Sequence, residues 1–117
     1  MTSDFEAIPG VPDLACGRIG EEFCFTFPAV LDAIRLCTAK EIAVLGVELF
    51  EVRPGGYATT NLSLYEREVG TGPKGIRGWV DYVKANNVRA TDFVSRNPGG
   101  DDHIYVLTTA SWKEFRE

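Results

Sequence analysis

The middle of the chain carries two β-prone hydrophobic runs that are separated by a proline and two glycines. Residues 42–52 place apolar side chains at both odd and even positions, a pattern typical of a strand covered on both faces. Proline has no N–H to give to a ladder, and glycine accepts the positive φ of a tight reversal. We therefore predict that residues 42–52 pair antiparallel with residues 57–65, with the turn at 54–56.

Glu48 is the one charged side chain within the hydrophobic part of that first strand. In a regular strand it shares a face with Val44 and Phe50, and a buried carboxylate needs a partner or loses its charge. One interpretation is a general acid, a general base or a ligand group. The other is structural: an arginine pairs with it, or Gly46 bulges the strand and turns Glu48 to solvent. We expect the structural one, and the candidate arginines are Arg53, Arg77 and Arg89.

Two segments repeat their apolar residues at helical spacing. Residues 28–40 begin with a proline, which is tolerated in a first helical turn, and they place Cys37 on the apolar face. We expect that thiol to be buried. A longer face runs from Ile76 or Gly78 to about Arg96 and is interrupted at Asn87, so the segment is either one helix or two helices that break at Asn86 and Asn87.

The remaining elements are shorter. Residues 103–109 alternate apolar and polar positions, which predicts a strand. Residues 22–27 alternate in the same way and predict a short strand or the extended lead-in to the helix that follows. Ser111-x-x-Glu114 matches a capping box that would start a C-terminal helix. Residues 1–20 are rich in proline and glycine and show no periodicity, so we expect an irregular arm ahead of a domain that spans 21–117.

These elements predict an α+β fold. We expect a single compact domain with an antiparallel or mixed sheet of three to four strands, a central hairpin, and two or three helices that cover the sheet. The βαβ alternation of a doubly wound sheet is missing from the pattern.

The charge and composition of the chain limit the classes of partner that we expect it to bind. The chain of 117 residues has 17 acidic and 12 basic side chains, a net charge of −5, and its basic residues are dispersed. This disfavours nucleic acid and anionic lipid and suits a basic protein partner. With no apolar run of membrane-spanning length and no signal-like N-terminus, we expect a cytoplasmic protein. Three cysteines and one histidine predict free thiols, no metal and no cofactor.

Two motifs could suggest chemistry, and we interpret both as structural. Residues 70–75 read G-x-G-x-x-G, but they follow a hairpin strand and include Pro73, so we expect a connector over 70–78 rather than a phosphate-binding loop. His103 is the only histidine and follows Asp101 and Asp102, but no serine or cysteine motif accompanies it. The sequence predicts no catalytic residue.

We expect the partner-binding residues to be aromatic and acidic side chains outside the core. Aromatic residues dominate the energetic centres of interfaces, and carboxylates attract a basic partner. The candidates are Tyr82, Trp112, Asp101, Asp102 and Glu48.

Three stretches, residues 45–52, 65–66 and 79–83, resemble the residue pattern of small bacterial immunity proteins that neutralise polymorphic toxins. That resemblance implies a non-enzymatic, acidic protein that binds a basic toxin, and a neighbouring toxin gene would support it.

Two other functions stay open. A small-molecule-binding or enzymatic domain would use Glu48 and His103, and a deep pocket joining them would favour it. A homo-oligomeric structural subunit would associate through a sheet edge or an aromatic patch, and a sizing measurement would reveal it.

Overall fold

A computed structural model describes residues 3–65 and 75–116 of the chain. The elements in chain order are α1 (Val11–Leu14), β1 (Gly17–Ile19), β2 (Glu22–Phe25), α2 (Ala29–Ala39), β3 (Ala43–Arg53), β4 (Gly56–Tyr65), α3 (Gly75–Arg96), β5 (His103–Ala110) and α4 (Trp112–Phe115).

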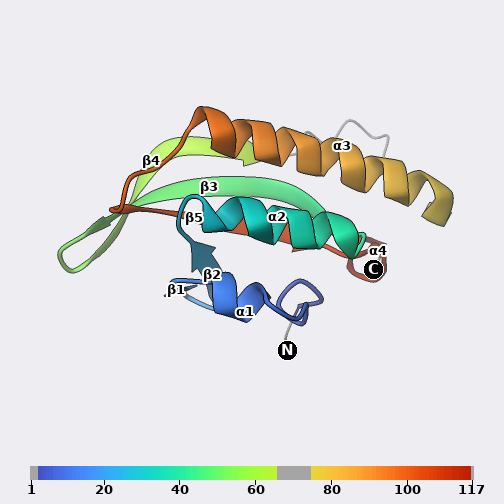
Figure 1. The fold of residues 1–117 in the computed structure, drawn as a ribbon, viewed down its shortest axis with the longest axis horizontal. Coiled ribbons are helices and arrows are strands. Elements are labelled where there is room, and N and C mark those ends of the chain that lie inside the picture. The colour runs from blue at the N-terminus through green and yellow to red at the C-terminus, as the bar shows by residue number, and fades with distance from the viewer. Residues whose placement is uncertain (1–2, 66–74, 117) are drawn as a thin grey trace.

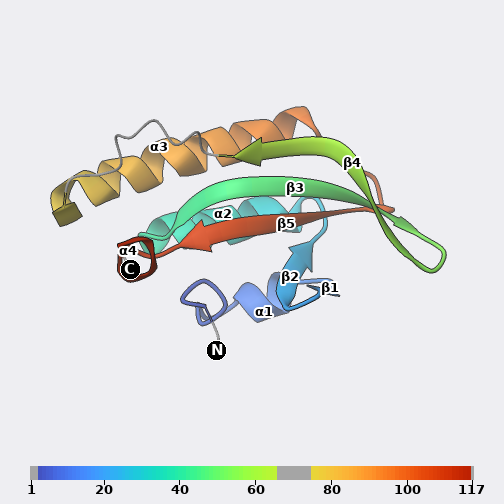
Figure 2. The same cartoon turned by 180° about the vertical axis from the view of Figure 1, so that it is seen from behind.

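The strands form one antiparallel sheet in the order β1-β2-β5-β3-β4. Because β5 lies between β2 and β3, and β3 lies between β4 and β5, the two helical crossovers interlock as split βαβ units. Helices α2 and α3 lie over the same face of the sheet, and the opposite face is turned to the viewer in Figure 2. The expected α+β class is confirmed.

The strand count is higher than predicted: the described residues form five strands. The additional strand is β1, which has only three residues and pairs with β2 through a reversal at Gly20, where φ is 61°. A strand this short gives no readable alternation. It lies within residues 1–20, where the sequence predicts an irregular arm, and α1 also lies there.

The hairpin prediction is confirmed. Strands β3 and β4 pair from Gly46–Tyr65 to Arg53–Gly56, so Pro54 and Gly55 make a two-residue turn. Gly55 has φ of 88°, the left-handed region that the third position of a type II turn requires.

The register of β3 differs from the regular strand that the sequence predicts. A bulge between Val44 and Gly46 inserts one residue relative to β5. Val44 therefore joins Val47 and Leu49 in the main core under the helices, while Glu48 lies on the other face of the sheet. The expectation that Glu48 and Val44 share a face is wrong. The alternative of a bulge is confirmed, with Leu45 as the extra residue just before Gly46, but Glu48 is half-buried rather than fully turned to solvent.

One continuous helix, α3, covers the sheet, and it does not break at Asn87. The side chain of Asn87 is 3% exposed and connects three elements. Its Oδ1 accepts from the Val44 N–H at 2.7 Å, and its Nδ2 donates to Thr38 Oγ1 at 2.8 Å and to the Ile42 carbonyl at 3.0 Å. Asn87 is tolerated on the buried face of the helix because both of its polar side-chain atoms have hydrogen-bond partners.

The helix α3 begins at Gly75, one residue before Ile76 and three before Gly78, which are the two starts that the sequence predicts. Residues 75–78 therefore form its first turn rather than the end of the predicted connector. The rest of that predicted connector, 70–74, lies outside the described residues, as does most of the G-x-G-x-x-G stretch.

The C-terminal capping box is confirmed. Ser111 N–H donates to Glu114 Oε1 at 2.8 Å, and Glu114 N–H donates to Ser111 Oγ at 3.2 Å. Asp4 contacts both residues, since its N–H donates to Glu114 Oε2 and its carboxylate accepts from the Ser111 hydroxyl. The N-terminal segment is therefore tied to α4.

Cys37 is fully buried on α2, as its helical position predicts, and all three cysteines are free thiols. In the described part of the chain, none of the helices combines the length and the hydrophobicity needed to cross a membrane.

Candidate functional site

The outer end of the β3–β4 hairpin projects past the helices (Figure 1). Val52 and Tyr57 are directly paired across its two strands, and their side chains are 42% and 50% exposed. Cross-strand partners on one face contact each other directly, so the two side chains form one apolar patch. Here the pair is exposed to solvent, and no signal in the sequence distinguishes Val52 and Tyr57 from other strand residues.

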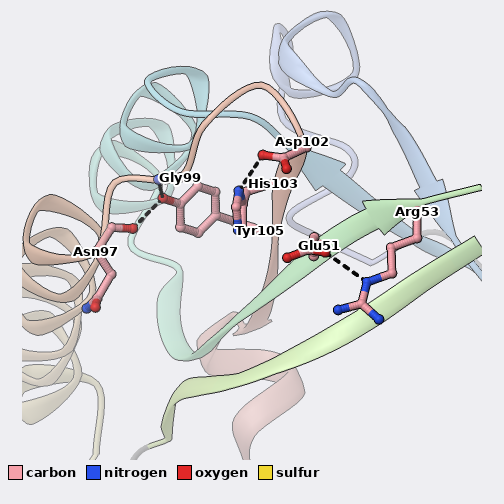
Figure 3. Close-up of polar contacts among 7 residues, drawn as sticks. All are labelled: Glu51, Arg53, Asn97, Gly99, Asp102, His103 and Tyr105. Carbon is pink, nitrogen blue, oxygen red and sulfur yellow. Dashed lines mark hydrogen bonds and ion pairs between the residues drawn. The ribbon is translucent and has the colours of Figure 1, made fainter.

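Residues 97–102 form a turn beside the hairpin. Hydrogen bonds to the side chain of Tyr105 hold this turn in place. The Tyr105 hydroxyl donates to the Asn97 carbonyl and accepts from the Gly99 N–H, both at 2.6 Å. Figure 3 shows the Tyr105 ring reaching toward these two residues. Gly99 is packed so closely that a Cβ there would lie 2.5 Å from the Cβ of His103. The Tyr105 hydroxyl therefore fixes the first half of the turn.

Burial is the main cause that raises the pKa of Tyr105, and the hydrogen bond from Gly99 acts in the opposite direction. The phenol consequently stays protonated at neutral pH, which allows it to donate to the Asn97 carbonyl.

The turn presents two exposed carboxylates, Asp101 and Asp102, next to the apolar pair. The carbonyl of Asp102 accepts the Val52 N–H at 2.7 Å, which joins the turn directly to the hairpin. Asp102 Oδ1 also lies 2.8 Å from Nδ1 of His103, whose side chain is 25% exposed.

Glu51 and Arg53 continue this polar edge along the hairpin. Glu51 is the cross-strand partner of His103, and its Oε1 lies 2.8 Å from Arg53 Nε (Figure 3). With Asp101 and Asp102 the edge carries three carboxylates and one guanidinium, so its net charge is negative. The side chain of Glu51 points to the sheet face opposite that of Val52, because the two residues are adjacent on β3. We refer to Val52, Tyr57, Asp101 and Asp102 together as the hairpin-end surface.

Tyr82 and Trp112 lie elsewhere. Both rings pack against Trp79, with centroids 5.4 Å and 5.5 Å from its own, and both side chains are half-buried. Trp112 follows the last residue of β5, whereas Asp101 and Asp102 precede the first, so the two groups lie at opposite ends of that strand. The structure does not bring the aromatic and acidic candidates together.

Glu48 and His103 also lie apart. Glu48 pairs with Val106 while His103 pairs with Glu51, an odd separation on both strands that directs the two side chains to opposite faces of the sheet. Two hollows of about 540 Å³, one between α2 and α3 and one beside β2, are lined by other residues. Neither hollow joins Glu48 to His103, the two residues that a small-molecule-binding or enzymatic domain would use.

Within the described ranges, the histidine, cysteine and carboxylate side chains form no cluster of three or more that could hold a metal ion. Comparisons of the chain with models of protein families, with curated proteins and with solved structures find no match.

Proposed function

We propose that this protein is a non-enzymatic protein-binding module and that its partner is a basic protein docking on the hairpin-end surface. The observation that carries the proposal is the exposed Val52–Tyr57 pair beside the fixed acidic turn of Asp101 and Asp102.

Each part of this surface suits an interface. Tyrosine is enriched among the residues that contribute most to binding, and an apolar centre with a charged rim is the common arrangement. The turn is preorganised by Tyr105 and Gly99, so little conformational entropy is lost when a partner orders it. The carboxylates select for positive charge on the partner.

The most specific form of the proposal is toxin immunity in a bacterial cytoplasm, which rests on the sequence resemblance and on the net charge of −5. An immunity protein needs no catalytic group, because blocking a basic toxin is a binding task. Co-expression with a toxin encoded beside it should then restore growth, and variants of the hairpin-end surface should fail to do so.

A capture experiment tests the binding surface. The wild-type chain and a Val52→Ser/Tyr57→Ser variant are immobilised and exposed to host lysate, and the retained proteins are identified by mass spectrometry. We expect one basic protein on the wild type and a loss of at least about tenfold in its affinity for the variant, since two central contacts are removed.

Val88→Ser is the matched control, because Val88 on α3 is 68% exposed and lies outside the hairpin-end surface. It should retain the partner. Equal retention by the double variant, or an acidic partner, would contradict the proposal.

A further inference from the structure

Cys16 and Cys24 lie on neighbouring backbones at the start of the β1–β2 hairpin. The Cys16 N–H donates to the Cys24 carbonyl at 2.9 Å, so the two residues are held in register. Their Sγ atoms are 3.5 Å apart, and the Cys16 Sγ also lies 3.3 Å from the Cys24 carbonyl oxygen. The sulfurs need to approach by only about 1.5 Å to reach the bond length of about 2.05 Å of a disulfide.

The two thiols have opposite environments. Cys16 is exposed, whereas Cys24 is 2% exposed and packs with Ile104 and Val106 on the sheet face away from α2 and α3. Burial, followed by the hydrogen bond and the charge of Cys16, raises the pKa of Cys24 to about 12. A reagent from solution therefore meets Cys16 first, and Cys24 is positioned behind it.

We propose that Cys16 and Cys24 are a reversible redox pair that a hydroperoxide converts to an intramolecular disulfide. The Cys16 sulfur attacks the terminal peroxide oxygen, the O–O bond breaks, and Cys16 becomes a sulfenic acid while the alcohol or water leaves. The Cys24 sulfur then attacks the Cys16 sulfur, the S–O bond breaks, and the hydroxide leaves as water with the proton of Cys24. Two thiols lose two electrons in total, and the peroxide gains them.

The disulfide would fix an edge of the sheet. Strand β1 has three residues and three paired positions, and its only sheet neighbour among the described strands is β2. A covalent link just before Gly17 would hold this edge closed, so amide exchange of β1 should slow after oxidation. A thiol reductant reverses the change by exchange.

The test treats the folded chain with hydrogen peroxide, alkylates the remaining thiols and measures the intact mass and the peptide map. The untreated chain has three free thiols. We expect two of the three to be lost, the mass before alkylation to fall by two hydrogens, and one cross-linked peptide to contain Cys16 and Cys24. Dithiothreitol should restore all three thiols.

Variants separate this result from nonspecific oxidation. Cys37→Ser should behave as the wild type does, while Cys24→Ser and Cys24→Ala should leave oxidised Cys16 without any intramolecular bond. Sulfinic acid or a Cys16-linked dimer in the wild type, with Cys24 still alkylated after unfolding, would overturn the proposal.

Discussion

At the scale of single residues, Asn87 explains why a polar side chain sits on the buried face of α3. The bulge in β3 leaves the Val44 N–H facing the helix, and the Asn87 amide accepts from it while donating to Thr38 and Ile42. The sequence marks Asn87 only as an interruption of a hydrophobic pattern, because its partners lie more than 40 positions away.

Replacing Asn87 by alanine should lower the free energy of unfolding by about 3 kcal/mol, since a buried donor and a buried acceptor lose their partner. Asn86→Ala is the matched control: Asn86 is also buried, but its Nδ2 bonds only to the Tyr82 carbonyl one turn back in its own helix. That variant should lose less than about 1 kcal/mol. Chemical denaturation of both variants measures the difference, and equal losses would refute this role for Asn87.

Cys37 should make the stability of the chain depend on alkaline pH. Burial raises the pKa of its thiol from 9.0 to about 12, so the folded state favours the neutral form. This contribution is complete below pH 9 and is lost as the pH rises toward 12, at about 1.4 kcal/mol per pH unit.

Cys37→Ala should therefore lose stability less steeply than the wild type between pH 9 and pH 12. Between pH 6 and pH 8 the unfolding free energies of the wild type and of Cys37→Ala should differ by a constant amount. That amount is the cost of the cavity that the smaller alanine side chain leaves. Parallel curves across the alkaline range would show that Cys37 titrates as an exposed thiol does.

At the scale of elements, the sequence predicts the hairpin, α2, β5 and the capping box because their signals are local. Pro54 and Gly55 specify a turn, and Ser111 and Glu114 specify a helix start. The sequence offers a bulge at Gly46 only as an alternative, because the pairing with β5 is needed to place the extra residue after Val44. The strand β1 was missed because three residues carry no periodicity.

The candidate site was predicted in part. Asp101 and Asp102 are visible in the sequence as an acidic turn, but Val52 and Tyr57 look like ordinary strand residues. Val52 lies four residues after Glu48 on β3, so its side chain is on the sheet face away from α2 and α3, where its cross-strand partner Tyr57 lies beside it. Which residues are covered at this end of the hairpin depends on the sheet register and on the placement of the helices, and no single residue reveals either.

Gly99→Ala should displace the turn at 97–102, because the new Cβ would meet the Cβ of His103 at 2.5 Å. We expect a loss of about 1–3 kcal/mol in unfolding free energy, as for other overpacked sites. Gly100→Ala is the control, since its nearest contact would be Asp102 Oδ1 at 3.4 Å and it should fold with near wild-type stability. Thermal unfolding compares them, and the account of a fixed turn fails if both are tolerated equally.

At the scale of the whole molecule, the fold separates two ends of one sheet. The end near α4 holds Trp79, Tyr82, Trp112 and Phe115 in an aromatic cluster. The opposite end, shared by the hairpin and the start of β5, is acidic and carries the open apolar pair. Figure 2 shows the strands running between these ends on the face away from α2 and α3. The aromatic residues and the acidic residues can both be recognised in the sequence. Their separation cannot, because it follows from the length of the strand β5 that lies between them.

The central claim, that a basic partner docks on the hairpin-end surface, is tested most directly by the association rate measured at several salt concentrations. Asp101→Asn/Asp102→Asn removes two charges from the surface, and Asp13→Asn/Asp81→Asn removes two exposed charges from α1 and α3.

Long-range attraction is screened over a Debye length of about 8 Å at physiological salt, so the wild-type association rate should fall as salt rises. The dissociation rate, set by Val52 and Tyr57, should change little. We predict that the Asp101/Asp102 variant associates more slowly at low salt and shows a flatter salt dependence, while the Asp13/Asp81 variant follows the wild type. Identical association rates for the wild type and the Asp101/Asp102 variant at every salt concentration would contradict the claim.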